Sequence, residues 1–285
     1  MNYRGRFAPS PTGPLHFGSL VAALASYLDA RANQGQWLVR IEDLDPLREP
    51  PGAADSILAS LEAHGLFWDE GVRFQSGRHD AYEAVLADWR QQERTYPCAC
   101  SRKELQANGG HHPRHCRDSP DWHQPPPFAL RFRTRAQHGT WQDRLLGRQQ
   151  YRIQGEADDF IVRRKEGYYA YHLAVVVDDI DQGINAIVRG QDLLELTPFH
   201  LILYEALDAP APSYLHVPLV YNHSGQKLSK QTGAPALDDR QASANIAQAM
   251  RALNHGLPGS LAEAPVKEQL AWGIENWHIP ALGEH

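Results

Sequence analysis

Two short segments, far apart in the chain, carry residue types that could bind a nucleotide. The first spans 8–19 (APSPTGPLHFGS), follows a strand-like run and opens a long apolar-periodic segment. Its prolines fix a turn, its glycines allow close backbone approach, and the free N–H groups of a helix start suit a phosphate. His16 and Ser19 could add polar contacts there. The second segment is 227–231 (KLSKQ), which holds two of the chain's few lysines. Taken alone, each could be an ordinary connector or a solvated loop.

The three cysteines form a second candidate site. Cys98, Cys100 and Cys116 are clustered and odd in number, which argues against a disulfide framework and for a cytoplasmic metal or thiol site. Cysteine sulfur and histidine nitrogen are the ligands of a closed, tetrahedral structural zinc. Three nearby histidines could supply a fourth ligand: His111, His112 and His115. The alternative is a set of three reduced, buried thiols.

Length and composition limit the number of domains and the class of protein that can carry these sites. The chain has 285 residues, of which 42% are hydrophobic, so one large domain or two to three small ones can be built around a real core. The net charge of −6 does not indicate a nucleic-acid-binding protein, although a local basic face is compatible with it. There is no charged-then-apolar leader and no long uncharged apolar run. We therefore expect a soluble, cytoplasmic protein that is neither secreted nor membrane-bound.

The elements that must position these residues alternate in type. Strand-like runs are expected at 3–7, 36–43, 168–177, 186–190 and 216–221, with a β-rich stretch at 128–159. Helical spacing is found at 20–32, 53–64, 82–94, 197–207, 242–253 and 266–274. Gly65 is expected just past the end of one helix, and Thr197 as the N-cap of another. The order strand, helix, strand, helix predicts an α/β layer with a parallel sheet, interrupted by an inserted subdomain that holds the cysteines.

Together, the motifs resemble a known family. Residues 6–13 with 15–18 resemble the first signature of class I aminoacyl-tRNA synthetases of the glutamyl branch, and 227–231 resemble the second, the lysine-serine-lysine loop. Segments 40–43, 171–179 and 187–190 fit the same branch in the same order. The resemblance implies an α/β fold, a Rossmann-type catalytic core with an inserted zinc-bearing subdomain and a short C-terminal helical region. It divides the chain into 1–95 and 168–212 (the two catalytic halves), 96–167 (the insertion) and 213–285 (the lysine loop and a helical region).

The resemblance also implies the substrates. A full glutamyl-tRNA synthetase carries a long C-terminal region that reads the anticodon, and this chain ends soon after the second signature. It is therefore similar to the short paralogues that activate L-glutamate with ATP, without needing tRNA, and attach it to the queuosine base of tRNA(Asp). Mg²⁺ would accompany ATP, one structural Zn²⁺ would sit in the insertion, and we expect a monomer.

Site residues follow from the matching motif positions. Charge that builds on phosphate oxygens calls for cations, and glutamate needs a cation for its side-chain carboxylate and an anion for its ammonium. The catalytic candidates are Lys230, Lys227 and His16. The ATP-binding candidates are Pro9, Ser10, His16, Gly18, Ser19, Lys227, Ser229 and Lys230. The glutamate-binding candidates are Arg6, Phe7, Ala8, Pro9, Ser10, Glu42, Tyr171 and Arg189. The metal candidates are Cys98, Cys100, His112 and Cys116, where His112 stands at the place of the family's usual tyrosine ligand.

Several alternatives stay open at this point. Glu42 and Arg189 could form structural ion pairs, with Arg40 or Asp43 taking their places. The chain could charge the acceptor end of tRNA(Glu), or be a non-catalytic tRNA-binding paralogue. A basic strand carrying Arg131, Arg133 and Arg135 could contact RNA phosphates or be a solvated face. The fourth zinc ligand could be His112, His111 or His115, and both the oligomeric state and the residues that bind the anticodon loop stay open.

Overall fold

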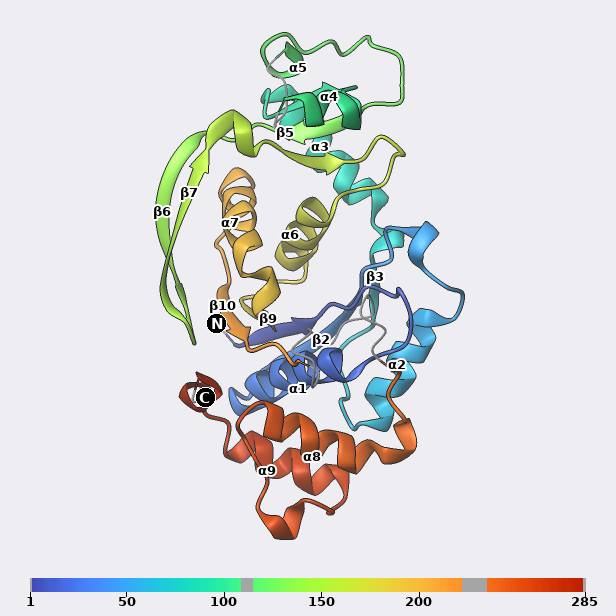
Figure 1. Ribbon diagram of the computed structural model, residues 1–285, viewed down its shortest axis with the longest axis vertical. Coiled ribbons are helices and arrows are strands. Elements are labelled where there is room, and N and C mark those ends of the chain that lie inside the picture. The colour runs from blue at the N-terminus through green and yellow to red at the C-terminus, as the bar shows by residue number, and fades with distance from the viewer. Residues whose placement is uncertain (1, 109–114, 222–234, 284–285) are drawn as a thin grey trace.

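The computed structural model describes residues 2–108, 115–221 and 235–283. Its first part is a small parallel sheet with helices packed against it (Figure 1). The strands are β1 (Arg4–Phe7), β2 (Gln36–Ile41) and β3 (Arg73–Phe74), in the order β1-β2-β3. The helices are α1 (Phe17–Ala32), α2 (Ala53–Ala63) and α3 (His79–Gln91). Because α1 connects the parallel strands β1 and β2, the turn that precedes α1 lies at the carboxyl end of β1.

The second part is another sheet that lies beside the first. Its strands are β6 (Ala136–Asp143), β7 (Gly147–Gln154), β9 (Ala186–Gly190) and β10 (Ser213–Val217), in the order β7-β6-β10-β9. The antiparallel pair β6–β7 is the long curved arm in Figure 1, and α7 (Thr197–Ala206) and α6 (Tyr171–Asp181) lie next to it. The N–H of Asn185 donates to the carbonyl of Arg4 at 3.0 Å, which joins β9 to β1. The carboxyl ends of both sheets therefore face one region.

The cysteine-bearing insertion and the C-terminal helices lie at opposite ends of the molecule (Figure 1). The insertion holds the antiparallel strands β4 (Thr95–Cys98), β5 (Ala129–Phe132) and β8 (Phe160–Arg163), with α4 (Arg102–Ala107) and α5 (His115–Asp118). At the other end α8 (Ala242–Ala252) and α9 (Val266–Glu275) pack on α1. Short 3₁₀ helices lie at Pro46–Arg48, Gln75–Gly77, Gly155–Asp158, Gln191–Leu196, Asp239–Gln241, Gly259–Leu261 and Ile279–Gly283.

Helix α1 is the centre of the largest core. Leu20, Leu24 and Leu28 are four residues apart, so they lie on one face of the helix, and all three are fully buried. Trp37 of β2 and Met250 of α8 belong to the same buried cluster as these leucines. A second core joins α3, α6 and α7 to the strands of the insertion. The first core, which includes Leu15, Val188 and Val217, holds the turn before α1 and the strands β9 and β10 in fixed relative positions.

Most expected elements are confirmed, and three predictions were wrong. The strand expected at 216–221 lies earlier in the chain, as β10 (Ser213–Val217). Residues 168–177 were expected as a strand but mainly form α6, because a fully buried apolar run of that length suits a buried helix as well as a buried strand. Thr197 does not cap its helix; the N-cap is Leu196, and the Thr197 hydroxyl accepts a hydrogen bond from Arg189 instead. Gly65 has φ +70°, as expected just past a helix end. Within the described residues, no helix is long and apolar enough to cross a membrane.

Candidate active site and candidate metal centre

The turn before α1 lines a cavity of about 580 Å³. The predicted residues that line it are Phe7, Ala8, Pro9, Ser10, His16, Gly18 and Ser19. The opposite wall is Gly190 at the end of β9 and 217–220 at the end of β10. A Cβ on Gly190 would lie 2.5 Å from Asp192 Oδ1 and 3.1 Å from Leu219 Cδ2, so a larger residue here would require these side chains to move.

His16 caps α1 at the edge of this cavity. Its Nδ1 accepts a hydrogen bond from the Ser19 N–H at 3.3 Å, and its Nε2 lies 2.9 Å from Ser19 Oγ. Because Nδ1 is an acceptor, Nε2 carries the ring proton and donates to the hydroxyl. The following N–H groups and the positive end of the helix dipole favour an anion at this end of α1.

The lysine segment lies outside the described residues, but the chain on both sides of it reaches the cavity. Residues 217–220 line the cavity just before the segment. Just after it, Ala236 forms a β-bridge with His16, and the N–H of Leu237 donates to the carbonyl of Leu15 at 3.0 Å. The predicted Lys227, Ser229 and Lys230 thus belong to a segment whose two ends adjoin the first signature.

A cluster of buried charges lies next to the turn. Arg6 Nε donates to Asp179 Oδ1 at 3.1 Å, and Arg40 Nη1 donates to the same oxygen at 2.7 Å. Burial alone would raise the pKa of Asp179, but the two guanidinium groups hold it below its ordinary value. Asp179 therefore stays ionised and holds both arginines. The half-buried Tyr171 interacts electrostatically with Arg6, Glu42 and Arg189, so four of the five predicted polar glutamate-binding residues face one region, and the fifth, Ser10, lines the cavity.

Glu42 is incompletely paired in this cluster. Its side chain is only 8% exposed, its Oε1 has no hydrogen-bond partner, and the nearest cation, Arg40 Nη2, is 3.6 Å away. Burial raises the pKa of Glu42 to about 7, against the opposing effect of Arg40 and Arg6. A buried carboxylate of this kind gains from a cationic partner, which a ligand ammonium can provide.

Arg189 is a buried cation that lacks an anionic partner among the described residues. Its guanidinium is buried and donates to His216 Nε2 at 3.0 Å, His200 Nδ1 at 3.2 Å and Thr197 Oγ1 at 2.9 Å. These acceptors and a fourth, the carbonyl of Leu193 at 3.2 Å, are neutral groups, and among the described residues no carboxylate pairs directly with Arg189. A buried cation with neutral partners has free energy to gain from an anion, such as a ligand carboxylate.

The sequence analysis missed the supporting residues Asp179, His200 and His216, and gave Arg40 only as an alternative. The sequence did contain a sign of the role of Asp179. Asp178 and Asp179 end an apolar run, and buried carboxylates must be paired. The alternative of structural ion pairs applies to Glu42 only in part: it forms a loose ion pair with Arg40 at 3.6 Å, whereas Arg189 pairs with no carboxylate among the described residues. Asp43 points elsewhere, with its carboxylate on the N–H of Ser76 at 2.9 Å.

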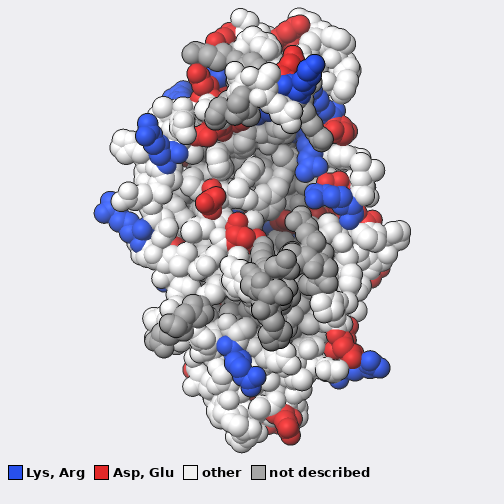
Figure 2. Space-filling view, in the orientation of Figure 1, with Lys and Arg blue, Asp and Glu red and all other residues white. Residues whose placement is uncertain are grey.

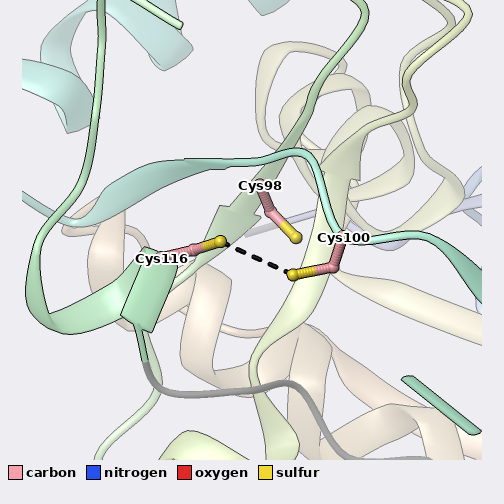
Figure 3. A group of neighbouring side chains, drawn as sticks. All are labelled: Cys98, Cys100 and Cys116. Carbon is pink, nitrogen blue, oxygen red and sulfur yellow. Dashed lines mark hydrogen bonds between the residues drawn. The ribbon is translucent and has the colours of Figure 1, made fainter. Parts of the chain in front are cut away.

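The cysteines of the insertion converge, as the sequence predicts (Figure 3). All three Sγ atoms lie within 4.8 Å of one another, with 3.5 Å between Cys100 and Cys116. Four thiolates around zinc at about 2.3 Å would be roughly 3.8 Å apart, so the spacing fits a tetrahedral metal. Burial and the neighbouring sulfurs raise the pKa of the Cys100 thiol to about 12, and a divalent cation is the partner that would let it ionise. His115 Nε2 is 3.8 Å from Cys100 Sγ, while His111 and His112 lie outside the described residues.

The basic strand is not a uniform solvated face. Arg131 is buried and donates to the carbonyl of Asp159 at 2.9 Å, so it is unavailable for RNA phosphates. The Arg133 guanidinium lies over the ring of Tyr96 at 5.0 Å, and Arg135 is exposed. Figure 2 shows the Lys and Arg side chains of one face singly or in small groups rather than in one stripe.

Comparisons with known proteins identify the family of this chain. Residues 2–251 match the family described as tRNA synthetases class I (E and Q), catalytic domain. A protein named glutamyl-Q tRNA(Asp) synthetase, from Pseudomonas syringae pv. tomato, is 49% identical over 98% of this chain and 94% of its own length. A protein of the same name from Vibrio cholerae is 46% identical over 100% of this chain and 93% of its own length.

A solved structure gives the same fold. A glutamate tRNA ligase from Elizabethkingia meningosepticum, in complex with its amino acid, superposes with a TM-score of 0.82 at 25% identity. The match covers 100% of this chain and 66% of that ligase. The chain belongs to the glutamyl and glutaminyl branch of the class I tRNA synthetases and, within that branch, to the glutamyl-Q tRNA(Asp) synthetases.

Proposed function

We propose that this chain activates L-glutamate with ATP and transfers the glutamyl group to the queuosine base of tRNA(Asp). In the first step an oxygen of the glutamate α-carboxylate attacks the α-phosphorus of ATP, the bond to pyrophosphate breaks, and glutamyl-adenylate forms. In the second step a hydroxyl of the modified base attacks the activated carbonyl and AMP leaves. The first step needs no tRNA.

One observation carries the proposal: a buried, loosely paired carboxylate and a buried cation with neutral partners lie beside the lining of a cavity at a helix N-terminus. The Glu42 N–H donates to the carbonyl of Pro9 at 3.0 Å, and Arg189 directly precedes Gly190; both Pro9 and Gly190 line the cavity. Glu42 Oε1 has no hydrogen-bond partner, and Arg189 has only neutral ones. An amino-acid ligand carries both missing partners, because its ammonium suits Glu42 and a carboxylate suits Arg189. The second carboxylate of glutamate distinguishes it from neutral amino acids, and Arg6 at the floor of the site is a further cation.

The cavity beside this cluster is the proposed ATP site. Pro9, Ser10 and Gly18 shape its wall, and His16 with Ser19 holds the start of α1 toward the phosphates. Lys227 and Lys230, with Ser229 between them, would stabilise negative charge on the phosphate oxygens as pyrophosphate leaves. Mg²⁺ bound with ATP would supply further charge neutralisation.

We also propose that Cys98, Cys100 and Cys116 hold one structural Zn²⁺, with His112 as the fourth ligand. The spacing of the sulfurs supports the metal, and the short contact of His115 with Cys100 makes His115 the competing fourth ligand. A closed shell of four ligands leaves no open position, so the metal would brace the insertion and take no part in the chemistry. We expect the protein to act as a monomer in the cytoplasm, where ATP and tRNA are found.

The decisive experiment is ATP–pyrophosphate exchange in the absence of tRNA. L-glutamate should support exchange, whereas L-glutamine and L-aspartate should not. Complete absence of glutamate-dependent exchange would favour a non-catalytic tRNA-binding paralogue and overturn the proposal.

Transfer is then measured on three RNAs: tRNA(Asp) with queuosine, tRNA(Asp) without it, and tRNA(Glu). Only the first should accept glutamate, and mass spectrometry of nuclease fragments should locate the glutamyl group in the anticodon loop. Glutamate found at the acceptor end of tRNA(Glu) would instead identify an acceptor-end glutamyl-tRNA synthetase.

A further inference from the structure

A row of three polar side chains crosses the second sheet beneath the proposed glutamate site. In the parallel pairing of β10 with β9, His216 is the direct partner of Arg189. On the other side of β10, Tyr214 pairs with Asp143, the last residue of β6. The sheet order β6-β10-β9 therefore brings Asp143, His216 and Arg189 side by side, although they are far apart in the sequence.

The hydrogen bonds in this row specify one protonation state. Asp143 Oδ2 lies 2.7 Å from His216 Nδ1 and also accepts from the His216 N–H at 3.1 Å. Asp143 Oδ1 accepts from the N–H groups of Leu145 and Leu146, both at 2.9 Å. Because an ionised carboxylate only accepts, Nδ1 of His216 carries the ring proton. Nε2 then has a free lone pair, and this lone pair accepts the Arg189 Nε–H at 3.0 Å.

The environment maintains that state. Burial alone would raise the pKa of Asp143, but its hydrogen bonds from His216 and from the backbone keep the pKa below its ordinary value. Burial lowers the pKa of His216, and the nearby Arg189 adds to this effect against the opposing effect of Asp143. The imidazole ring is also held mechanically, since Tyr214 stacks on it at 5.9 Å and Trp141 meets it edge-on at 5.7 Å.

We infer that His216, oriented by Asp143, is a positioning residue for Arg189: it holds the guanidinium in the orientation that leaves an Nη1 N–H for a carboxylate of the substrate. This inference rests on the proposed function and deepens it, because it makes the inserted β6–β7 arm part of the amino-acid site. Arg189 Nη1 and Nη2 are placed by His200 and Thr197, but Nε is held only by His216 among the described residues. Loss of the Nε bond would leave the guanidinium held through its outer nitrogens alone, by His200, Thr197 and the carbonyl of Leu193, so the Nε edge would no longer be fixed.

The test uses two substitutions that each keep one half of the imidazole's hydrogen bonding. His216→Asn retains a donor near the Nδ1 position toward Asp143 and loses the acceptor for Arg189. His216→Gln retains an acceptor near the Nε2 position and loses the donor to Asp143. A displacement of about 1 Å in a binding group can cost up to roughly 10²-fold, so we expect His216→Asn to raise the KM for glutamate by 10- to 100-fold. The KM for ATP should stay within about 2-fold, and His216→Gln should restore most of the glutamate affinity.

Pyrophosphate exchange with the full chain provides the readout, with thermal melting of each variant alongside. His138→Asn is the matched control, because His138 is exposed on the same β6 strand. Asp143→Asn gives a second, independent test: it removes the charge that selects the His216 tautomer and should also raise the KM for glutamate selectively. It takes the place of His216→Asn should that variant not fold.

The possible results distinguish a failure of the role inferred for His216 from a failure of the proposed function. Wild-type exchange combined with an unchanged glutamate KM in His216→Asn overturns this inference and leaves the proposed function intact. Equal increases in the KM for glutamate and for ATP, with a lower melting temperature and no recovery in His216→Gln, indicate a general structural role and also overturn it. Absence of glutamate-dependent exchange in the wild-type chain overturns both.

Discussion

Replacing Glu42 by glutamine should make the protein more stable and less able to bind its substrate. The Glu42 carboxylate is buried with one oxygen unpaired, so its charge is held at a cost that a neutral amide of the same size avoids. The same charge is what we expect the ammonium of glutamate to meet. Stability and function are therefore opposed at this one residue.

The magnitude follows from the pKa. Burial raises the pKa of Glu42 from the ordinary value of 4.5 to about 7, and each pKa unit corresponds to about 1.36 kcal/mol. Between these two pH values the folded state holds a proton that the unfolded state has released, so the free energy of unfolding falls as the pH rises. Above pH 7 the full cost applies, about 3 kcal/mol. Glutamine at this position is neutral at every pH and avoids it.

The assay is urea denaturation of the wild type and of Glu42→Gln at pH 8 and at pH 5. We expect the variant to be more stable by about 3 kcal/mol at pH 8 and by less than about 1 kcal/mol at pH 5, where wild-type Glu42 is mainly protonated. Glu62→Gln, an exposed position on α2, is the control and should change little at either pH. Glutamate-dependent pyrophosphate exchange should show a strongly raised KM for glutamate in Glu42→Gln only.

Two results would refute this reasoning. One is a variant that is no more stable than the wild type at pH 8. The other is a stability gain of equal size at both pH values, which would show that the carboxylate charge is not its source. Added L-glutamate gives a third check, because it should stabilise the wild type and not the variant.

Three further predictions concern other parts of the chain. Lys230→Ala should abolish pyrophosphate exchange with no change in the melting temperature, while the exposed Lys267→Ala should retain exchange; wild-type rates in Lys230→Ala would remove it from the mechanism. The purified protein should contain one zinc, and Cys116→Ala should lose the metal and melt earlier by calorimetry; full zinc content in that variant would rule out the site. Asp29→Asn should lower the free energy of unfolding by about 3 kcal/mol, because buried Asp29 accepts from Arg144 at 2.8 Å and from Trp277 at 2.9 Å; a loss below about 1 kcal/mol in denaturant would contradict this.

Local pattern was a good guide wherever one face of an element is buried. Helix α1 repeats leucine every fourth residue, and its start is marked by the turn at 8–19, so both could be read before the fold was known. Helix α6 shows where this fails. It is buried on nearly every side, so its apolar run has no periodicity to separate a helix from a strand, and only its packing between α3 and α7 decides.

The family, the chemistry expected of each motif and the grouping of the cysteines could be predicted from the amino-acid sequence, because signatures and ligand types occur in short, ordered segments. Only the tertiary structure decided which charges meet. Asp179 holds Arg6 and Arg40, while Glu42 and Arg189 are left without full ionic partners. His216 of β10 accepts a hydrogen bond from Arg189 of β9, and Asp143 of β6 in turn bonds His216. Such pairings depend on sheet order and register between distant segments, and these are set by packing of the whole chain rather than by any local stretch of it.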